Sequence, residues 1–282
     1  MKIKKILNNS AVVVDDHGQE KIAMGGGISF EKGKNDIVDK QRIEKLFILE
    51  DQERYGYLQE MLQTLPEEEI AVSESIISYA EQELQISFNE HIHIALTDHL
   101  SFALERLRSG LMIHNTLLEE IRLLYPAEFQ IGLHAKQLIT ERLQIDIPED
   151  EVGYIAMHIH TARMNAGAQD TAAGMAAIMK DMVKDIEYML HQPLDRKSAD
   201  YERLMSQLKS ILQEYQKDQP GSELNRELIQ IAVEKYQTVY EQVEEMAENM
   251  EDEYGYTFTE SQCVLITIEV NRLLERLGHS SR

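Results

Sequence analysis

The sequence predicts an α+β protein of several domains, in which a small antiparallel β-sheet precedes two all-α helical bundles. Two observations predict this class. Short β-branched runs separated by turn residues fill the first 48 positions, and amphipathic helical periodicity fills most of the chain from about residue 66. A length of 282 residues suits about two or three domains, and a hydrophobic content of 43% supplies side chains for packed cores.

Strand-like segments and turn residues alternate through the N-terminal region. The expected strands are residues 3–7, 11–14, 21–24 and 28–30. The turns between them hold Asn8-Asn9, Asp15-Asp16-His17-Gly18 and Gly25-Gly26-Gly27. A sheet this small has one hydrophobic face and little to cover it, so we expect it to dimerise by pairing with a second copy.

Helical periodicity follows in five segments. The apolar repeats predict helices over residues 66–84, 94–107, 111–124, 145–164 and 175–190. We expect Gly110, Gly132 and Gly167 to act as helix stops or junctions, and the small polar stretch 165–174 to be a linker. The expected domains are therefore residues 1–58, 66–168 and 172–282.

The charge distribution limits the partners. With 28 basic and 50 acidic side chains the net charge is −22, which excludes a generally basic nucleic-acid binder and disfavours a membrane-surface protein. Residues 1–45 differ, because they hold nine basic and seven acidic side chains; this suggests a dock for an anionic partner, or a chance departure from the mean. One cysteine, Cys263, and no apolar run near about 18 residues predict a cytoplasmic protein without a membrane span.

The histidines are the most informative candidates for functional residues. Five lie in the first helical region, at His91, His93, His99, His158 and His160. On a helix, residues two apart point about 200° from each other, so neither His-x-His pair can chelate one ion, and we expect no metal. Imidazole has a nucleophilic nitrogen that can accept a phosphoryl group, while structural or surface histidines are the alternative. Neither a nucleotide loop nor a nucleophile elbow occurs, so we expect no cofactor and no enzyme.

Two segments of the helical region recur farther along the chain. Residues 96–100 match 204–208 at an offset of 108, and 151–159 match 262–270 at an offset of 111. The same order at a nearly constant offset predicts a duplicated helical domain. The repeat places Gln207 where the first copy has His99, and Glu269 where it has His158.

The ordered motifs KIKKILNNS, MGGGISF, TDHLSFALERL and EVGYIAMHIHTA resemble the BglG/LicT/SacY family of transcriptional antiterminators over essentially the whole chain. The resemblance implies an RNA-binding sheet domain that dimerises and grips an RNA hairpin, stabilising it against a transcription terminator. It also implies that both helical bundles are regulation domains of the sugar phosphotransferase system (PTS). Their histidines would receive phosphoryl groups from the carrier HPr and a sugar-specific enzyme II.

Residue by residue, the resemblance implies phosphorylation at His99 and His158 and altered acceptor positions at Gln207 and Glu269. It assigns RNA contact to Lys5, Asn8, Asn9, Ser10, Gly25, Gly26, Gly27 and Phe30, with backbone amides near Gly25 and Gly27 as donors. Two positions depart from the family pattern. Gly26 stands where an arginine is usual, which removes a guanidinium, and Ser10 replaces a third asparagine.

Several alternatives stay open. Phe30 is either a stacking surface for a base or part of the sheet core. Glu269 either supplies a permanent negative charge in place of a removable one, or belongs to a structural, dimerising domain. The leading functional hypothesis is an RNA-binding antiterminator repressed through the first regulation domain. The competing hypotheses are a degenerate PTS-sensing interaction protein with weak or altered RNA binding, and a metal or phosphotransfer enzyme built on the histidines.

Overall fold

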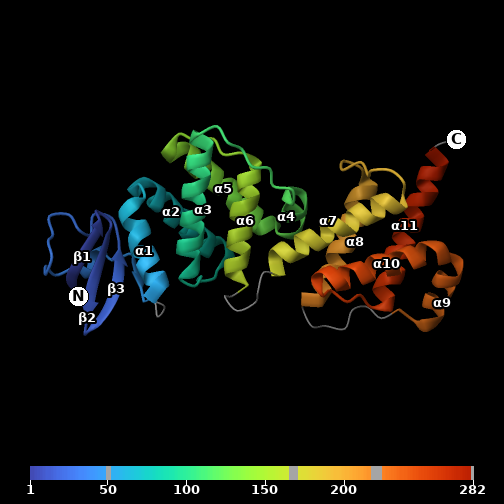
Figure 1. The fold of residues 1–282 in the computed structure, drawn as a ribbon, viewed down its shortest axis with the longest axis horizontal. Helices are drawn as coiled ribbons and strands as arrows, with labels where there is room; N and C mark the ends of the chain where they lie inside the picture. The colour runs from blue at the N-terminus through green and yellow to red at the C-terminus, as the bar shows by residue number, and fades with distance from the viewer. Residues whose placement is uncertain (49–51, 165–170, 217–223, 281–282) are drawn as a thin grey trace. The chain divides into compact units, whose positions relative to one another are not determined.

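The computed structural model describes residues 1–48, 52–164, 171–216 and 224–280 (Figure 1). The chain divides into two compact units, one of residues 1–118 and 125–169, the other of residues 119–124 and 170–282. A four-stranded antiparallel sheet opens the first unit, and helices make up the rest of the described elements. The predicted fold class is therefore confirmed.

The sheet is a simple meander. Its strands are β1 (Lys2–Asn8), β2 (Ala11–Asp16), β3 (Gln19–Met24) and β4 (Lys45–Phe47), paired in that order. His17 and Gly18 connect β2 to β3 with φ values of 55° and 88°, the left-handed conformation that a tight two-residue hairpin requires. The turn that the residues Asp15-Asp16-His17-Gly18 predict is therefore confirmed.

The strand predicted at 28–30 is wrong. Gly27 adopts a φ of 63°, and the amides of Ile28 and Phe30 donate to the carbonyls of Gly25 and Gly27, so this segment forms consecutive turns. The fourth strand is instead β4, whose three residues are too short to show an alternating pattern.

Both faces of the sheet are covered within the chain. On one face Ile28 and Val38, from the connection between β3 and β4, pack on Ile3, Val12, Val14 and Ala23. On the other, Leu58, Met61 and Leu62 of α1 (Gln52–Thr64) pack on Leu7, Val13, Ile22 and Phe47. The expectation of an uncovered sheet face is therefore wrong, because α1 and the connection between β3 and β4 cover the sheet. Dimerisation itself stays a prediction.

A helical bundle completes the first unit. Its helices are α2 (Glu67–Leu84), α3 (His91–Arg108), α5 (Pro126–Leu143) and α6 (Glu149–Arg163). Fully buried Ile76, Leu96, Ile139 and Ile155, one from each helix, lie in its core. The helices predicted at 66–84, 94–107 and 145–164 are confirmed.

Two predictions for this bundle are wrong in detail. Gly132 is not a junction but lies inside α5, where an added Cβ would stand 2.6 Å from the carbonyl oxygen of Val152 in α6. Glycine there permits close helix packing, whereas Gly110 (φ 74°) does follow the end of α3. Of the run 111–124, only α4 (Leu118–Leu124) is helical.

The second unit contains α7 (Thr171–Met189), α8 (Ala199–Gln216), α9 (Arg226–Lys235), α10 (Gln237–Tyr254) and α11 (Glu260–Ser280). The linker prediction is wrong over 171–174, which are helical, and its remaining residues 165–170, including Gly167, lie outside the described residues. Burial raises the pKa of the Cys263 thiol to about 11, which disfavours a nucleophilic thiolate. Within the described ranges, none of the helices is long and apolar enough to span a bilayer.

Candidate functional site

Two turns at one end of the sheet, residues 8–10 and 25–30, form a single surface. The amide of Gly25 donates to the carbonyl of Ser10 at 2.9 Å. The Ser29 hydroxyl lies 3.0 and 3.1 Å from the carbonyl oxygens of Asn8 and Asn9, and the Ser29 amide also donates to Asn9. The structure thereby joins most of the residues for which the family resemblance implies RNA contact.

The three consecutive glycines have different roles. An added Cβ at Gly25 would lie 1.8 Å from the carbonyl oxygen of Arg42, so only glycine fits. Gly27 needs glycine for its positive φ. Gly26 is exposed, and a Cβ there would meet only the Glu44 carboxylate, at an ordinary 3.6 Å. A side chain can therefore be added at position 26 but not at its neighbours.

Some expected donors are already used within the chain. We expected the Gly25 amide to be available to RNA, but it donates to the Ser10 carbonyl, so this prediction is wrong. The Gly26 amide donates to the Glu44 carboxylate at 3.0 Å. The Asn8 side chain donates to the Leu62 carbonyl and accepts from the Ser10 amide, both at 2.8 Å, so it fastens the turn to α1. Lys5 lies in mid-strand, with its amine 3.4 Å from Gln59 of α1.

Phe30 and Asn9 carry the exposed side chains of this surface. The Phe30 side chain is 60% exposed, so its assignment to the sheet core is wrong. Asn9 is also exposed, although its amide donates to the Glu67 carboxylate of α2 at 3.0 Å. An exposed ring beside an exposed amide side chain can stack on a base and hydrogen-bond to it.

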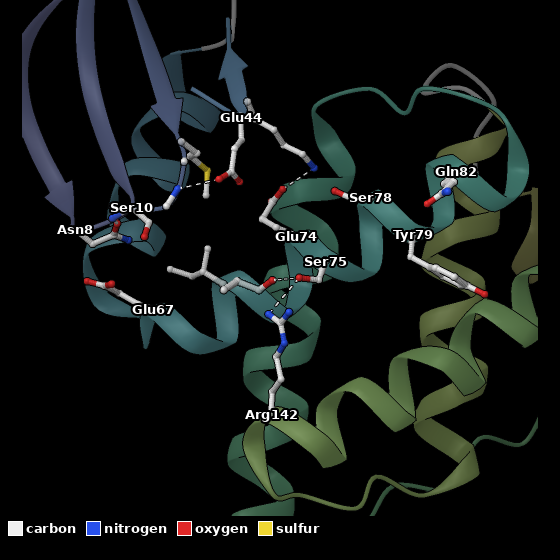
Figure 2. A pocket seen from close by; sticks show the side chains of 16 residues that line it. Asn8, Ser10, Glu44, Glu67, Glu74, Ser75, Ser78, Tyr79, Gln82 and Arg142 are labelled. Atoms are coloured by element: carbon white, nitrogen blue, oxygen red, sulfur yellow. Dashed lines mark hydrogen bonds and ion pairs between the residues drawn. The ribbon is translucent and has the colours of Figure 1, made fainter. Parts of the chain in front are cut away.

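A cleft of about 540 Å³ lies between this end of the sheet and α2 (Figure 2). Asn8, Ser10, Gly25 and Gly26 line it on the sheet side. Its lining holds three carboxylates, Glu44, Glu67 and Glu74, and two cations, Lys45 and Arg142. This small negative excess does not attract phosphate, so we expect nucleic acid to contact the outer, exposed side of the turns.

A second constellation, the histidine pair, lies within the helical bundle. His99 of α3 and His158 of α6 have ring centroids 4.8 Å apart. Nε2 of His99 is 3.2 Å from a carboxylate oxygen of Glu151, whose other oxygen accepts from Arg106 at 2.7 Å. The two predicted acceptors, 59 residues apart in sequence, thus face each other beside an ion pair between buried Glu151 and half-buried Arg106.

The surroundings set the protonation of this pair. Burial, and next the charge of His99, lower the pKa of His158 from 6.5 to about 4. Burial alone would raise the pKa of Glu151, but the interaction with His99 and the charge of Arg106 outweigh it and lower that pKa. At neutral pH, His158 is therefore an uncharged imidazole with a nucleophilic nitrogen, and its neighbour His99 faces the ionised carboxylate of Glu151.

His93 and His160 have structural roles. His93 is buried, with Nδ1 2.8 Å from Glu74, which also pairs with Lys45 of β4 at 2.8 Å. His160 is buried on Tyr125, with Nδ1 3.0 Å from Glu128. Within the described part of the chain, no group of three or more potential ligands could hold a metal ion.

The altered acceptor positions lie in the second unit. Gln207 is half-buried on α8. Glu269 on α11 is only 3% exposed, and its carboxylate accepts from Arg272 at 2.6 Å and lies 3.3 Å from Arg203. Arg272 also donates to Asp200 at 2.6 Å. Glu269 is thus a buried carboxylate held by cations.

Comparison with known proteins gives matches over both units. A CAT RNA binding domain model matches residues 1–55, and a PRD domain model matches residues 74–162 and again 180–273. The transcription antiterminator LicT of Bacillus subtilis is 33% identical over 98% of this chain and 100% of its own length; the beta-glucoside operon antiterminator of Dickeya chrysanthemi is 32% identical over 98% of each. The crystal structure of GlcT CAT-PRDI superposes with a TM-score of 0.54 at 36% identity, covering 58% of this chain and 98% of that one.

An RNA-binding sheet domain followed by two copies of one helical domain defines a regulator that acts on RNA. The double PRD match also confirms the predicted duplication. The chain belongs to the BglG/LicT/SacY family of transcriptional antiterminators.

The low pKa of His158 predicts a specific acid sensitivity. Between pH 6.5 and about 4 the unfolded chain binds a proton at this site that the folded chain does not, so stability falls as pH drops through this window. Lowering the pH from about 7 to about 5 should therefore cost about 2 kcal/mol of unfolding free energy through His158.

Urea unfolding of the chain and its His158→Gln variant at both pH values measures this loss. The variant should lack that part of the acid sensitivity. His114→Gln, which alters a ring with 91% of its side chain exposed, is the control and should retain it. Equal acid sensitivity in the chain and the His158→Gln variant would contradict the assignment.

Proposed function

We propose that this chain is an antiterminator that binds an RNA hairpin with the 8–10 and 25–30 turns and stabilises it against an overlapping terminator. The observation that carries the proposal is the joining of these turns into one surface with Phe30 and Asn9 exposed. The chain would act by binding rather than catalysis, in the cytoplasm where transcripts are made. Exposed Ile6 and Ile37 of the sheet domain are compatible with its acting as a homodimer.

Stacking on Phe30 should supply a large part of the hairpin affinity. Base–aromatic stacking is worth about 1–3 kcal/mol, so Phe30→Ala should weaken binding by about tenfold. Fluorescence anisotropy of a labelled antiterminator-type hairpin, titrated with the full chain, measures this change.

Tyr188→Ala is the matched control, since Tyr188 is an aromatic residue of α7 with 78% exposure. It should leave the affinity unchanged. Equal affinities for the two variants would remove Phe30 from the interface, and failure of the unaltered chain to prefer such hairpins over a stem-scrambled RNA would overturn the proposed function.

Regulation would enter at the histidine pair. We propose that PTS proteins, HPr or a sugar-specific enzyme II, transfer a phosphoryl group to His99 and His158. A phosphoryl group on His99 would put about two negative charges where the ring is now 3.2 Å from the Glu151 carboxylate. The attraction between the His99 ring and the Glu151 carboxylate would become a repulsion. This supports a change in the contact between α3 and α6 and an inhibition of RNA binding.

In the second regulation domain, we propose that Glu269 supplies a permanent negative charge in place of a phosphorylated histidine. Its burial against Arg272 and Arg203 supports this role, because an enclosed carboxylate acts on its neighbours with little screening. Its single charge is smaller than that of a phosphoryl group, so the substitution is a partial one.

Glu269→Gln keeps the size of the side chain but removes its charge, and Arg272 still has Asp200 as a partner. If the charge holds the second domain in an RNA-binding form, this variant should bind the hairpin several-fold more weakly. The control is Glu275→Gln, farther along α11 at an exposed position, which should bind normally. Reduced thermal stability with unchanged hairpin affinity would instead support a structural role for Glu269.

The second candidate is a PTS-sensing interaction protein with weak or altered RNA binding. The internal hydrogen bonds of the Gly25 and Gly26 amides and the missing arginine at position 26 favour it. Phosphorylation of His99 together with undetectable hairpin binding would select this function. Stoichiometric metal binding would instead select an enzyme built on the histidines.

A further inference from the structure

We infer that Arg42 supplies the guanidinium that contacts the RNA at the glycine turn, replacing the arginine that this chain lacks at position 26. This inference rests on the proposed function, because it names a further contact residue of the same RNA surface. Arg42 is distant in sequence from the glycine motif and is brought to it only by the fold.

The backbone places Arg42 at the turn. It ends a single turn of 3₁₀ helix, η1 (Lys40–Arg42), which begins where the Asp39 side chain accepts from the Gln41 amide at 3.0 Å. The Arg42 carbonyl then packs against Gly25 so closely that no side chain fits there. This contact fixes the Cα of Arg42 beside the glycine turn, whatever rotamer its side chain adopts.

The side chain extends over the same turn. Nη1 of Arg42 donates to the carbonyl of Gly27 at 2.8 Å. Arg42 is exposed, and among the described residues no carboxylate pairs with it, whereas Arg106, Arg163 and Arg272 each pair with at least one. A guanidinium has several further N–H donors in a rigid planar fork, and here these remain available to a ligand.

The exposed side chain of Phe30 begins on the same turn as this cation. Nη1 of Arg42 and Cβ of Phe30 each lie 3.8 Å from the point that a Cβ of Gly27 would occupy. The guanidinium and the first side-chain atom of Phe30 therefore flank one residue of the turn. This combination suits an unstacked RNA base, since the ring stacks on the base and the fork donates two hydrogen bonds to an edge with two acceptors, such as that of guanine.

The local charge also favours Arg42 as an RNA contact. Carboxylates face the cleft on the α2 side, and Glu44 is bound to the Gly26 amide. Arg42 donates to Gly27, the neighbouring residue, and is the one cation with a described hydrogen bond to the glycine turn. Contact with phosphate would use only its charge, while contact with a base edge needs the planar fork, and substitution by lysine separates these possibilities.

The test is an anisotropy titration of the full chain with an antiterminator-type hairpin. Arg42→Gln should weaken binding about tenfold or more, because charge and fork are both lost. Arg42→Lys should bind nearly as weakly, since it keeps the charge without the fork. Lys40→Gln is the matched control: it removes an exposed cation from the same 3₁₀ turn and should change affinity less than about threefold.

A compensating variant makes the test independent of folding. Gly26→Arg fits the turn sterically, so adding it to Arg42→Gln should restore much of the lost affinity. Equal effects of Arg42→Gln and Lys40→Gln, or no rescue by Gly26→Arg, would overturn the inference. Unchanged hairpin affinity of Arg42→Lys would show that Arg42 contacts a phosphate through its charge alone, and would contradict its contact with a base edge. If the unaltered chain binds no hairpin, the proposed function fails and this inference fails with it.

Discussion

The approach of the Arg42 carbonyl to Gly25 is the constraint on which the N-terminal domain depends. Because no Cβ can occupy that space, the long connection between β3 and β4 can return across the end of the sheet. Its return brings Ile28 and Val38 onto one sheet face and brings Ser29 to the 8–10 turn. One glycine therefore serves both the core and the candidate RNA surface.

Helix α3 physically connects the two candidate sites. It carries His99, which faces His158 and Glu151, and also His93, which is bound to Glu74. Glu74 in turn pairs with Lys45 of β4, next in sequence to the Glu44 that holds the Gly26 amide. A displacement of α3 on phosphorylation would thus act on groups only a few contacts from the glycine turn. Three carboxylates of the first unit, Glu151, Glu74 and Glu44, take part in this chain of contacts.

Local patterns predicted most of the fold, and long-range packing decided the rest. The hairpin at His17-Gly18 and the helix beginning at Glu67 follow from turn chemistry and from acidic residues in a first turn. Helix α5 was not predicted because Gly132 was interpreted as the end of a helix. In the structure Gly132 lies inside α5 and allows the helix to pack closely on Val152. Strand β4 has three residues and is fixed by pairing with β3, which no local pattern reveals. For the site, the family resemblance implied His99 and His158 as phosphoacceptors, but no sequence signal could join Arg42 to the glycines.

The central claim is that hairpin binding and the state of the histidine pair are coupled. Transcription in vitro, from a template that carries an antiterminator-type hairpin overlapping a terminator, tests this claim most directly. The purified chain should raise read-through, and prior phosphorylation of His99 and His158 by PTS proteins should lower it again. A His99→Gln, His158→Gln double variant should be insensitive to those proteins. Read-through that does not respond to the chain, or that stays high after both histidines are phosphorylated, would contradict the account.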